Sequence, residues 1–393
     1  MFEILKKDKN SLARVGSLKT SHGVIETPAY AIAATDGWVR TLEPEDLAST
    51  RSQIFIVNTF HIWKRFGFDQ KLTNFSGIHQ EMSWQGPLMS DSGGFQVFSY
   101  GFGREHQVGK IASFFPRDNQ PIFQPELNLV KVTHQGVLFK DGESEIFLGP
   151  RESIKIQEKI GADIILSFDE CTSPFNDYFY TRDALRRTHR WAKICLETKS
   201  RRDQLLFGIV QGGAWKDLRT ASASYLSQLP FDGFAIGGSL GKSKEEMFRI
   251  LKWVIPLLPE DKPRHLLGIG RPEDIFEAVK LGIDLFDCVV PTREARHGSL
   301  WTKKGRIDIL KTKYLKDFSL LDGGCQCPVC QKGVSRSELH QMFKQKDPLA
   351  GRLSTLHNVF FFNDFMEKMR QAIKEDEFEA FSHHFSFLLS PSK

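Results

Sequence analysis

An acidic side chain lies near the end of a short apolar segment, and two arginines follow it closely. Residues 285–290 have the length and composition of a buried strand, and Pro291 cannot continue the interior of a sheet. Asp287 therefore lies near a strand end, where the catalytic groups of α/β enzymes gather. Arg293 and Arg296 are three residues apart, so on a helical turn they share one face and could bind a phosphate. The segment predicts a carboxylate beside an anion site, although an ordinary ion pair between the aspartate and one arginine fits it as well.

Three cysteines within six residues, Cys325, Cys327 and Cys330, form a second group that could do chemistry. Zinc prefers thiolate ligands, and the glycines and the proline in this stretch favour tight turns that let the cysteines converge. A tetrahedral site needs a fourth ligand, for which His340 and His357 are the candidates. We prefer His357, because it lies near the start of the last helical pattern and would tie that helix to the cysteines. Such a ligand set leaves no position for water, so we expect a structural Zn²⁺ site.

Eight short apolar segments, most of them separated by helical patterns, must position these side chains. The strand candidates are residues 27–33, 53–58, 87–91, 163–169, 205–211, 233–237, 264–268 and 285–290. The helix candidates are residues 151–160, 183–199, 218–229, 244–258 and 272–280. This alternation predicts an α/β fold of the (β/α)8 TIM-barrel type rather than an open doubly wound sheet. The strand ends would then bring a mostly polar set to one mouth of the barrel: Asn58, Asp91, Asp169, Gln211, Gly237, Gly238, Gly268 and Asp287.

Two stretches do not fit the alternation, and they suggest a division of the chain into three parts. Residues 1–296 are expected to form the barrel, with an insertion at about 100–142. Residues 297–358 would form a basic, zinc-binding subdomain. Its basic residues before the cysteines are Lys303, Lys304, Arg306, Lys311, Lys313 and Lys316. Residues 359–393 would form a C-terminal helical segment, whose patterned helix over 359–373 is expected to pack on the barrel.

The overall composition is that of an ordinary globular protein. The chain has 393 residues, 40% of them hydrophobic and 26% charged, which suits one large domain or two unequal ones. Its net charge of +5 permits a polyanionic partner without requiring one. The N-terminal residues lack the apolar stretch of a secretory signal, and no apolar segment reaches the length of a membrane span. We therefore expect a cytoplasmic protein with no membrane partner.

The chain is similar to the tRNA-guanine transglycosylase (queuine tRNA-ribosyltransferase) family, bacterial type, over almost its full length. The matching motifs are NTFH at 58–61, SDSGGFQVFS at 90–99, FDEC at 168–171, GIVQGG at 208–213, FAIGG at 234–238, HLLGIG at 265–270 and LHN at 356–358, together with the three cysteines. As a set they are far more specific than any one motif. The family fold is a TIM barrel with a zinc subdomain, which agrees with the count of strands.

The resemblance implies a base exchange: the wobble guanine (position 34) of tRNA is replaced by a 7-deazaguanine base in queuosine biosynthesis. Asp287 would attack the ribose C1′ to form a covalent intermediate, and Asp91 would act as general acid and base. The residues that would bind the base are Phe95, Asp169, Gln211, Gly237, Gly238 and Leu267. Those that would contact the RNA backbone are Arg293, Arg296, Lys303 and Lys304. The implied partners are tRNA with a wobble guanine, the free 7-deazaguanine base and a second copy of the chain.

Two features bear on the choice of base and on catalysis. Lys242 lies in a shortened loop that lines the base pocket, near a position where the family commonly has an acidic residue. If it pointed into the site it would disfavour the aminomethyl cation of 7-aminomethyl-7-deazaguanine (preQ1), but most lysines face solvent, so we expect preQ1, with queuine as the second candidate.

A non-catalytic tRNA-binding subunit is the alternative function, and the presence of both Asp91 and Asp287 favours the enzyme. A barrel hydrolase of small molecules would leave the basic stretch and the cysteines without a purpose.

The insertion also departs from the family pattern, since the stretch from about 104 to 133 is longer than usual. Residues 127–133 partly alternate apolar with polar side chains, and residues 136–139 are mostly apolar. We expect the two runs to pair as antiparallel strands over the barrel mouth. The resemblance assigns no role to this insertion.

Overall fold

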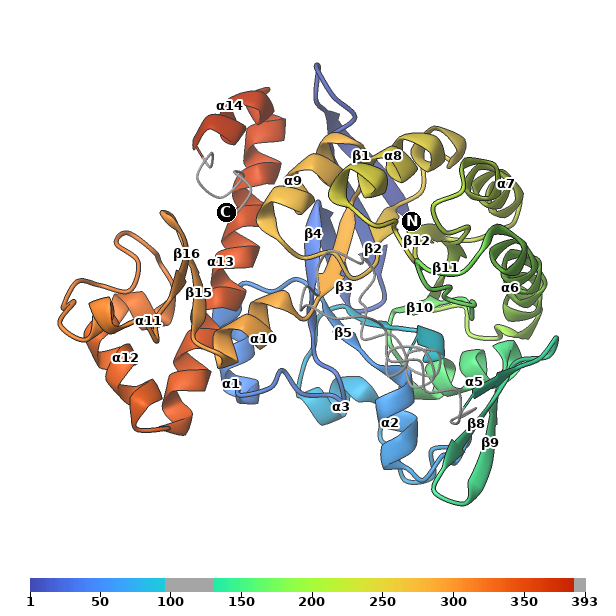
Figure 1. Ribbon diagram of the computed structural model, residues 1–393, viewed down its shortest axis with the longest axis horizontal. Coiled ribbons are helices and arrows are strands. Elements are labelled where there is room, and N and C mark those ends of the chain that lie inside the picture. The colour runs from blue at the N-terminus through green and yellow to red at the C-terminus, as the bar shows by residue number, and fades with distance from the viewer. Residues whose placement is uncertain (96–129, 385–393) are drawn as a thin grey trace.

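Eight parallel strands form a closed barrel at the centre of the molecule (Figure 1). The computed structural model describes residues 1–95 and 130–384. The strands are β4 (Ala29–Ala33), β5 (Phe55–Val57), β6 (Leu88–Ser90), β10 (Ile164–Leu166), β11 (Leu205–Val210), β12 (Gly233–Ile236), β13 (Arg264–Leu266) and β14 (Leu285–Cys288). Their order around the barrel is β10-β11-β12-β13-β14-β4-β5-β6. Each strand lies inside a predicted segment, so the TIM-barrel prediction is confirmed.

Helices surround the barrel (Figure 1). They include α1 (Pro44–Leu47), α2 (Thr59–Arg65), α3 (Ile78–Met82), α5 (Pro150–Ile160), α6 (Tyr178–Thr198), α7 (Lys216–Ser227), α8 (Lys244–Val254) and α9 (Pro272–Lys280). The five predicted helices are all present, but α6 begins at residue 178 rather than at residue 183. Its earlier start follows from Asp177, whose side chain caps the helix by accepting a hydrogen bond from the backbone N–H of Tyr180.

A three-stranded antiparallel sheet covers the N-terminal end of the barrel. It consists of β1 (Phe2–Lys7), β2 (Arg14–Thr20) and β3 (Gly23–Thr27). Side chains of this sheet, Phe2, Leu18 and Ile25, are buried in one cluster with side chains from the barrel strands such as Ala31 and Met89. The barrel interior is therefore closed at the end opposite to the strand ends that carry the polar residues.

The insertion contributes a second antiparallel sheet, formed by β7 (Val130–Val132), β8 (Val137–Asp141) and β9 (Ser144–Leu148). The predicted pairing of its first two runs is confirmed where the structure describes them, and β9 is an additional strand that the sequence did not indicate. The ring of Phe139 on β8 packs against Phe60 and Trp63, so this sheet lies on α2. The remaining part of the predicted insertion, 100–129, falls outside the described residues.

The chain ends in a mixed region beside the barrel. It comprises α10 (Val290–Arg296), β15 (Ser299–Thr302), β16 (Gly305–Asp308), α11 (Pro328–Gln331), α12 (Arg336–Lys344), α13 (Pro348–Lys374) and α14 (Phe378–His384). The long helix α13 begins at residue 348, where Asp347 caps it, and not at residue 359 as predicted. The expected subdomain boundary at residue 358 therefore falls inside α13.

As expected, α13 packs on the barrel. The ring of Phe362 lies 5.3 Å from that of Tyr30 on β4, measured between centroids. Arg370 donates a hydrogen bond of 2.8 Å to the carbonyl oxygen of Pro28. Among the described residues, no helix is both long enough and apolar enough to cross a membrane.

Candidate active site at the barrel mouth

Asp91 lies directly after β6 and is held by three hydrogen bonds to its carboxylate. Oδ2 accepts from the side-chain amide of Asn58 at 2.5 Å. Oδ1 accepts from the backbone N–H groups of Thr59 at 2.9 Å and of Gly93 at 3.0 Å. The donors come from the ends of both β5 and β6, so neighbouring strands fix the orientation of this half-buried carboxylate.

Asp287 is the third residue of β14. This strand lies on the opposite side of the barrel from β10, four strands away in either direction. Its Oδ1 accepts a hydrogen bond of 3.0 Å from the backbone N–H of Gly268, at the end of β13. The ring nitrogen Nε2 of His265 is also 3.0 Å from that oxygen. The side chain of Asp287 is 19% exposed while that of His265 is fully buried, so the carboxylate can be reached from the mouth and the imidazole cannot.

Asp169 and Gln211, after β10 and β11, form a polar pair that is almost completely buried. Gln211 Nε2 donates a hydrogen bond of 2.5 Å to Asp169 Oδ2, and the hydroxyl of Ser92 lies 3.5 Å from Oδ1. The side-chain oxygen of Gln211 is buried and has no hydrogen-bond donor within the described part of the chain. An acceptor in this state fits a site that awaits N–H groups of a ligand.

Glycines after β12 and the loop after β6 complete the surroundings of this pair. A β-carbon on Gly237 would lie 3.2 Å from the side chain of Leu267, and one on Gly94 would lie 3.1 Å from the carbonyl oxygen of Asp169. Phe95 follows Gly94 and is 41% exposed. The structure thus gathers the predicted base-binding residues, and both predicted catalytic aspartates lie on the same rim.

Arg219, on α7, is a residue of this site that the sequence did not single out. Its guanidinium is fully buried and donates hydrogen bonds to the carbonyl oxygens of Gly213, Val210, Gly237 and Ser239 at 2.7, 2.9, 3.0 and 2.6 Å. Burial lowers its pKa to about 9, which still leaves it charged at neutral pH. One side chain therefore holds together the loops after β11 and β12, which carry the predicted base-binding residues Gln211 and Gly238.

The predicted RNA-binding residues lie beside the mouth but differ in how free their charges are. Arg293 is exposed and Arg296 is half-buried. Burial lowers the pKa of Arg296, and the positive charges of Arg40 and Arg293 lower it further. Arg40, which the sequence gave no reason to select, therefore belongs to the same basic cluster. Such an accumulation of like charges favours an anionic partner.

The two predicted lysines behave differently from each other. The ammonium group of Lys303 donates a hydrogen bond of 2.8 Å to the carbonyl oxygen of Gly324, next to the cysteines. Lys304 is exposed. The basic residue after them, Arg306, pairs with Glu294 at 2.9 Å. Lys304 is therefore the better placed of the two lysines to contact a phosphate.

Lys242 is exposed, as expected of a lysine in this loop. Its backbone N–H donates a hydrogen bond of 2.6 Å to a carboxylate oxygen of Glu246. Its ammonium group lies 6.0 Å from the centroid of the Phe175 ring. The prediction that Lys242 faces solvent is confirmed.

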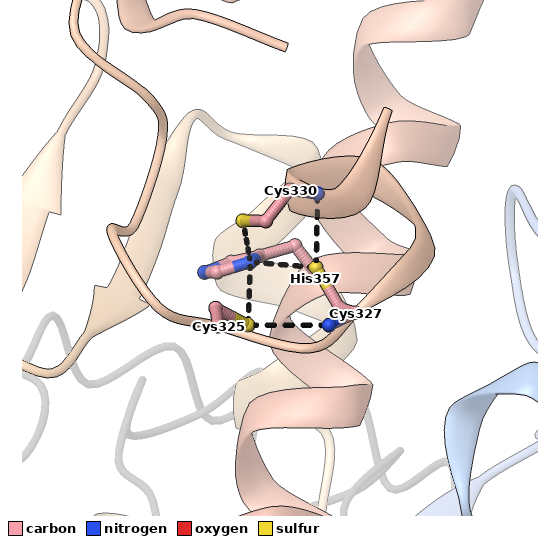
Figure 2. A group of neighbouring side chains, drawn as sticks. All are labelled: Cys325, Cys327, Cys330 and His357. Carbon is pink, nitrogen blue, oxygen red and sulfur yellow. Dashed lines mark hydrogen bonds between the residues drawn. The ribbon is translucent and has the colours of Figure 1, made fainter. Parts of the chain in front are cut away.

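The three cysteines and His357 form a buried cluster between the cysteine loop and α13 (Figure 2). Nδ1 of His357 lies 4.0, 3.3 and 3.6 Å from the sulfur atoms of Cys325, Cys327 and Cys330. Its other nitrogen, Nε2, is 2.8 Å from the carbonyl oxygen of Trp301, which leaves Nδ1 available as a ligand.

The second candidate for the fourth ligand is engaged elsewhere. Nδ1 of His340 is 2.7 Å from the carbonyl oxygen of Ile309, and this histidine is not part of the cluster. The structure therefore places His357, the preferred candidate, with the three cysteines. Four converging soft and borderline donors are a set that could hold a metal ion.

Comparison with known proteins agrees with this geometry. The profile of the family described as queuine tRNA-ribosyltransferase matches residues 8–388. A queuine tRNA-ribosyltransferase of Halothermothrix orenii is 42% identical over 388 residues, covering 98% of this chain and 96% of the relative. One of Herpetosiphon aurantiacus is 42% identical over 373 residues, covering 94% of this chain and 88% of the relative.

An archaeal protein, from Archaeoglobus fulgidus, carries the same name provisionally. It is 45% identical over 382 residues, covering 93% of this chain and 94% of the relative. The match extends over the barrel, the cysteine cluster and α13 together. The chain therefore belongs to the queuine tRNA-ribosyltransferase family, and it is a pentosyltransferase.

Proposed function

We propose that this enzyme exchanges the wobble guanine (position 34) of tRNA for a 7-deazaguanine base. The observation that carries the proposal is the placement of Asp91 and Asp287 on one rim of the barrel, each oriented by backbone N–H groups. Exchange of a base without net hydrolysis needs two carboxylates with different tasks, as retaining glycoside chemistry does. The names of the relatives support the substrate class.

In the proposed mechanism Asp287 is the nucleophile. Its carboxylate oxygen attacks C1′ of the ribose, the bond from C1′ to N9 of guanine breaks, and the ribose is held as an ester of the enzyme. Asp91 donates a proton to the leaving guanine and then takes the N9 proton of the incoming base. The new bond to C1′ forms as the ester breaks, so no water is consumed and both carboxylates return to their starting state.

The buried polar pair would recognise the base. The carboxylate of Asp169 can accept hydrogen bonds from the N–H groups of a purine edge, and the unpaired oxygen of Gln211 can accept another. The absence of a side chain at Gly238 lets the base approach the backbone, and Gly237 and Leu267 would border the pocket. The exposed ring of Phe95 would stack on the base.

The base inserted is most consistent with preQ1, and queuine is the second candidate. No cation from Lys242 opposes an aminomethyl group, because this lysine is exposed and lies near Phe175. Competition between guanine, queuine and the 7-deazaguanines that carry nitrile or aminomethyl groups, on one tRNA, tests this choice. Failure of the aminomethyl base to enter tRNA would contradict it.

The basic cluster would bind the backbone of the tRNA near the target base. Arg293 and Arg296 lie on α10, directly after the strand that carries Asp287, so phosphates held there would be close to the nucleophile. Lys304 would extend this contact toward the cysteine cluster, and Lys303 would contribute less because Gly324 already accepts from its ammonium group. Binding through these residues should weaken steeply with added salt.

The four-residue cluster would hold a structural Zn²⁺. Three thiolates and one imidazole fill a tetrahedral shell and leave no position for water, so the ion would contribute folding free energy and no catalysis. It would fix the cysteine loop to α13 through His357 and so fasten this region to the barrel.

The two oriented carboxylates, Asp91 and Asp287, favour the enzyme over the alternative of a non-catalytic tRNA-binding subunit. The family resemblance also implies a homodimer. Incubation with labelled guanine and unfractionated tRNA separates the two functions, because only the enzyme incorporates label into RNA. Light scattering of the purified chain tests the dimer. Incorporation of label is the expected result, and its absence together with retained tRNA binding would favour the alternative.

A further inference from the structure

A second group of metal-binding residue types lies at the opposite end of the barrel from the catalytic carboxylates. His22, His79 and Asp163 have ligand atoms that all lie within 4.8 Å of one another. His22 is in the turn between β2 and β3, His79 is in α3, and Asp163 immediately precedes β10. Because Asp163 comes before the strand that Asp169 follows, the two carboxylates lie at opposite rims.

The carboxylate of Asp163 is fully buried and its position is fixed by the backbone. Oδ1 accepts a hydrogen bond of 3.0 Å from the N–H of His22, and Oδ2 accepts one of 2.9 Å from the N–H of Leu88. Nδ1 of His22 lies 2.8 Å from Oδ1, and Nε2 of His79 lies 3.4 Å from Oδ2. The two imidazole rings are stacked, with centroids 3.6 Å apart, so both present a nitrogen to one carboxylate.

The remaining contact of His79 decides which of its nitrogens bears the hydrogen. Nδ1 lies 3.1 Å from the carbonyl oxygen of Trp84, which can only accept, so a neutral ring carries its hydrogen on Nδ1 and a bare lone pair on Nε2. Nε2 is buried and faces an oxygen of Asp163 at 3.4 Å without a well-formed hydrogen bond to it. Two acceptors in this position repel each other unless a proton or a metal ion lies between them.

We propose that His22, His79 and Asp163 bind one divalent transition-metal ion of the class of Zn²⁺, Co²⁺ and Ni²⁺. Imidazole nitrogens suit these ions better than Mg²⁺ or Ca²⁺, which prefer oxygen ligands throughout. The hydrogen bond from His79 to a backbone carbonyl is the support that metal-bound histidines have. The side chain of His22 is 38% exposed, so the ion can enter from solvent and water can complete its coordination.

The ion would tie three separate segments together: the turn between β2 and β3, helix α3 and the start of β10. The N-terminal face of a TIM barrel serves stability rather than catalysis. Metal binding should therefore raise the thermal stability of the protein and leave base exchange unchanged. The site is independent of the proposed function, and its test needs no tRNA.

The test uses the full chain with zinc already bound at its cysteine cluster. The protein is equilibrated with Co²⁺ at pH 7.5, bound cobalt and zinc are measured per chain by elemental analysis, and the thermal midpoint is recorded with and without Co²⁺. We expect one cobalt ion per chain at unchanged zinc content, together with a higher midpoint. His79→Gln should weaken cobalt binding by at least about tenfold and remove the midpoint shift.

Two further variants make the test decisive. His22→Gln changes an exposed side chain and should lose cobalt in the same way even if His79→Gln folds poorly. His134→Gln removes another exposed histidine, outside the site, and should bind cobalt as the unchanged protein does. Cobalt binding that is equal in all these proteins, or cobalt that enters only by displacing zinc, would overturn the proposal. His79 would then be an imidazolium paired with Asp163.

Discussion

A β-carbon added to Gly238 would lie 1.9 Å from the side-chain oxygen of Gln211. The backbone of Gly238 also has a φ of +73°, in the left-handed region that favours glycine. The absence of a side chain at this position is therefore what allows Gln211 to reach Asp169 and form its 2.5 Å hydrogen bond. The position of Gln211, a predicted base-binding residue, thus depends on a glycine.

Gly238→Ala should displace Gln211 and reduce kcat/KM for guanine exchange by roughly 100-fold, because a shift of about 1 Å at a positioning group has this effect. Steady-state kinetics with labelled guanine measure it. Gly67→Ala is the matched control, since Gly67 also has a positive φ (+63°) but an added β-carbon there meets nothing within 4 Å. Equal losses in both variants would mean that backbone strain, and not the contact with Gln211, is responsible.

Arg219→Met should destabilise the protein, because four carbonyl oxygens would each lose a hydrogen bond from the guanidinium, and within the described part of the chain only that of Val210 would keep one, from the N–H of Gly237. Each orphaned group costs about 1 to 3 kcal/mol, so we expect the free energy of unfolding in urea to fall by at least about 3 kcal/mol. Arg249→Met changes an exposed arginine on the neighbouring helix and should have little effect. A variant at position 219 as stable as the unchanged protein would show that water can replace the guanidinium.

His357→Ala should release the metal and loosen α13, because this histidine joins the helix to the cysteines. Elemental analysis should find about one zinc ion per chain in the unchanged protein and much less in the variant. Hydrogen exchange should be faster along α13, with smaller changes in the strands of the barrel. His340→Ala should keep its zinc, and loss of zinc from that variant alone would assign the fourth ligand to His340 instead.

Asp274 makes stability depend on pH. Burial raises the pKa of its carboxyl to about 6, and the nearby ammonium group of Lys244, at 2.7 Å, offsets this only in part. Between about pH 4 and pH 6 the folded protein holds this proton more tightly than the unfolded chain does, so the contribution of Asp274 to the free energy of unfolding falls as pH rises.

Asp274→Asn should therefore gain stability relative to the unchanged protein as the pH increases from 4 to 6, by about 2 to 3 kcal/mol at most. Urea unfolding at several pH values measures the difference. Asp261→Asn, at an exposed site, serves as the control. A difference between Asp274→Asn and the unchanged protein that stays constant over this range would mean that the carboxyl is not protonated in the folded state.

The barrel could be predicted because its strands are short apolar runs that end in polar residues. This local pattern is visible in the sequence without knowledge of any tertiary contact. The N-terminal sheet could not, since β1 buries only Phe2 and β3 buries only Ile25 and Thr27, and this burial depends on the barrel end they cover. The early start of α6 depends on one capping contact of Asp177, and the early start of α13 on one of Asp347.

The motifs supplied the predicted catalytic and base-binding residues but not the residues that support them. Arg219 binds carbonyl groups up to 20 residues away in the chain, and His265 contacts Asp287 from the neighbouring strand, β13 beside β14. The approach of Arg40 to Arg296 likewise follows only from the closed barrel. Of these supporting residues, only His265 lies within a motif that matches the family, so it alone could have been selected from the sequence.

The central claim is that Asp287 holds the ribose covalently during exchange. The most direct measurement is a denaturing gel of the protein quenched during turnover with labelled tRNA, alongside binding of the same tRNA by filter retention. We predict a protein–RNA adduct with the unchanged protein and with Asp261→Ala, and none with Asp287→Ala, which should still bind tRNA. An undiminished adduct in Asp287→Ala would contradict the account.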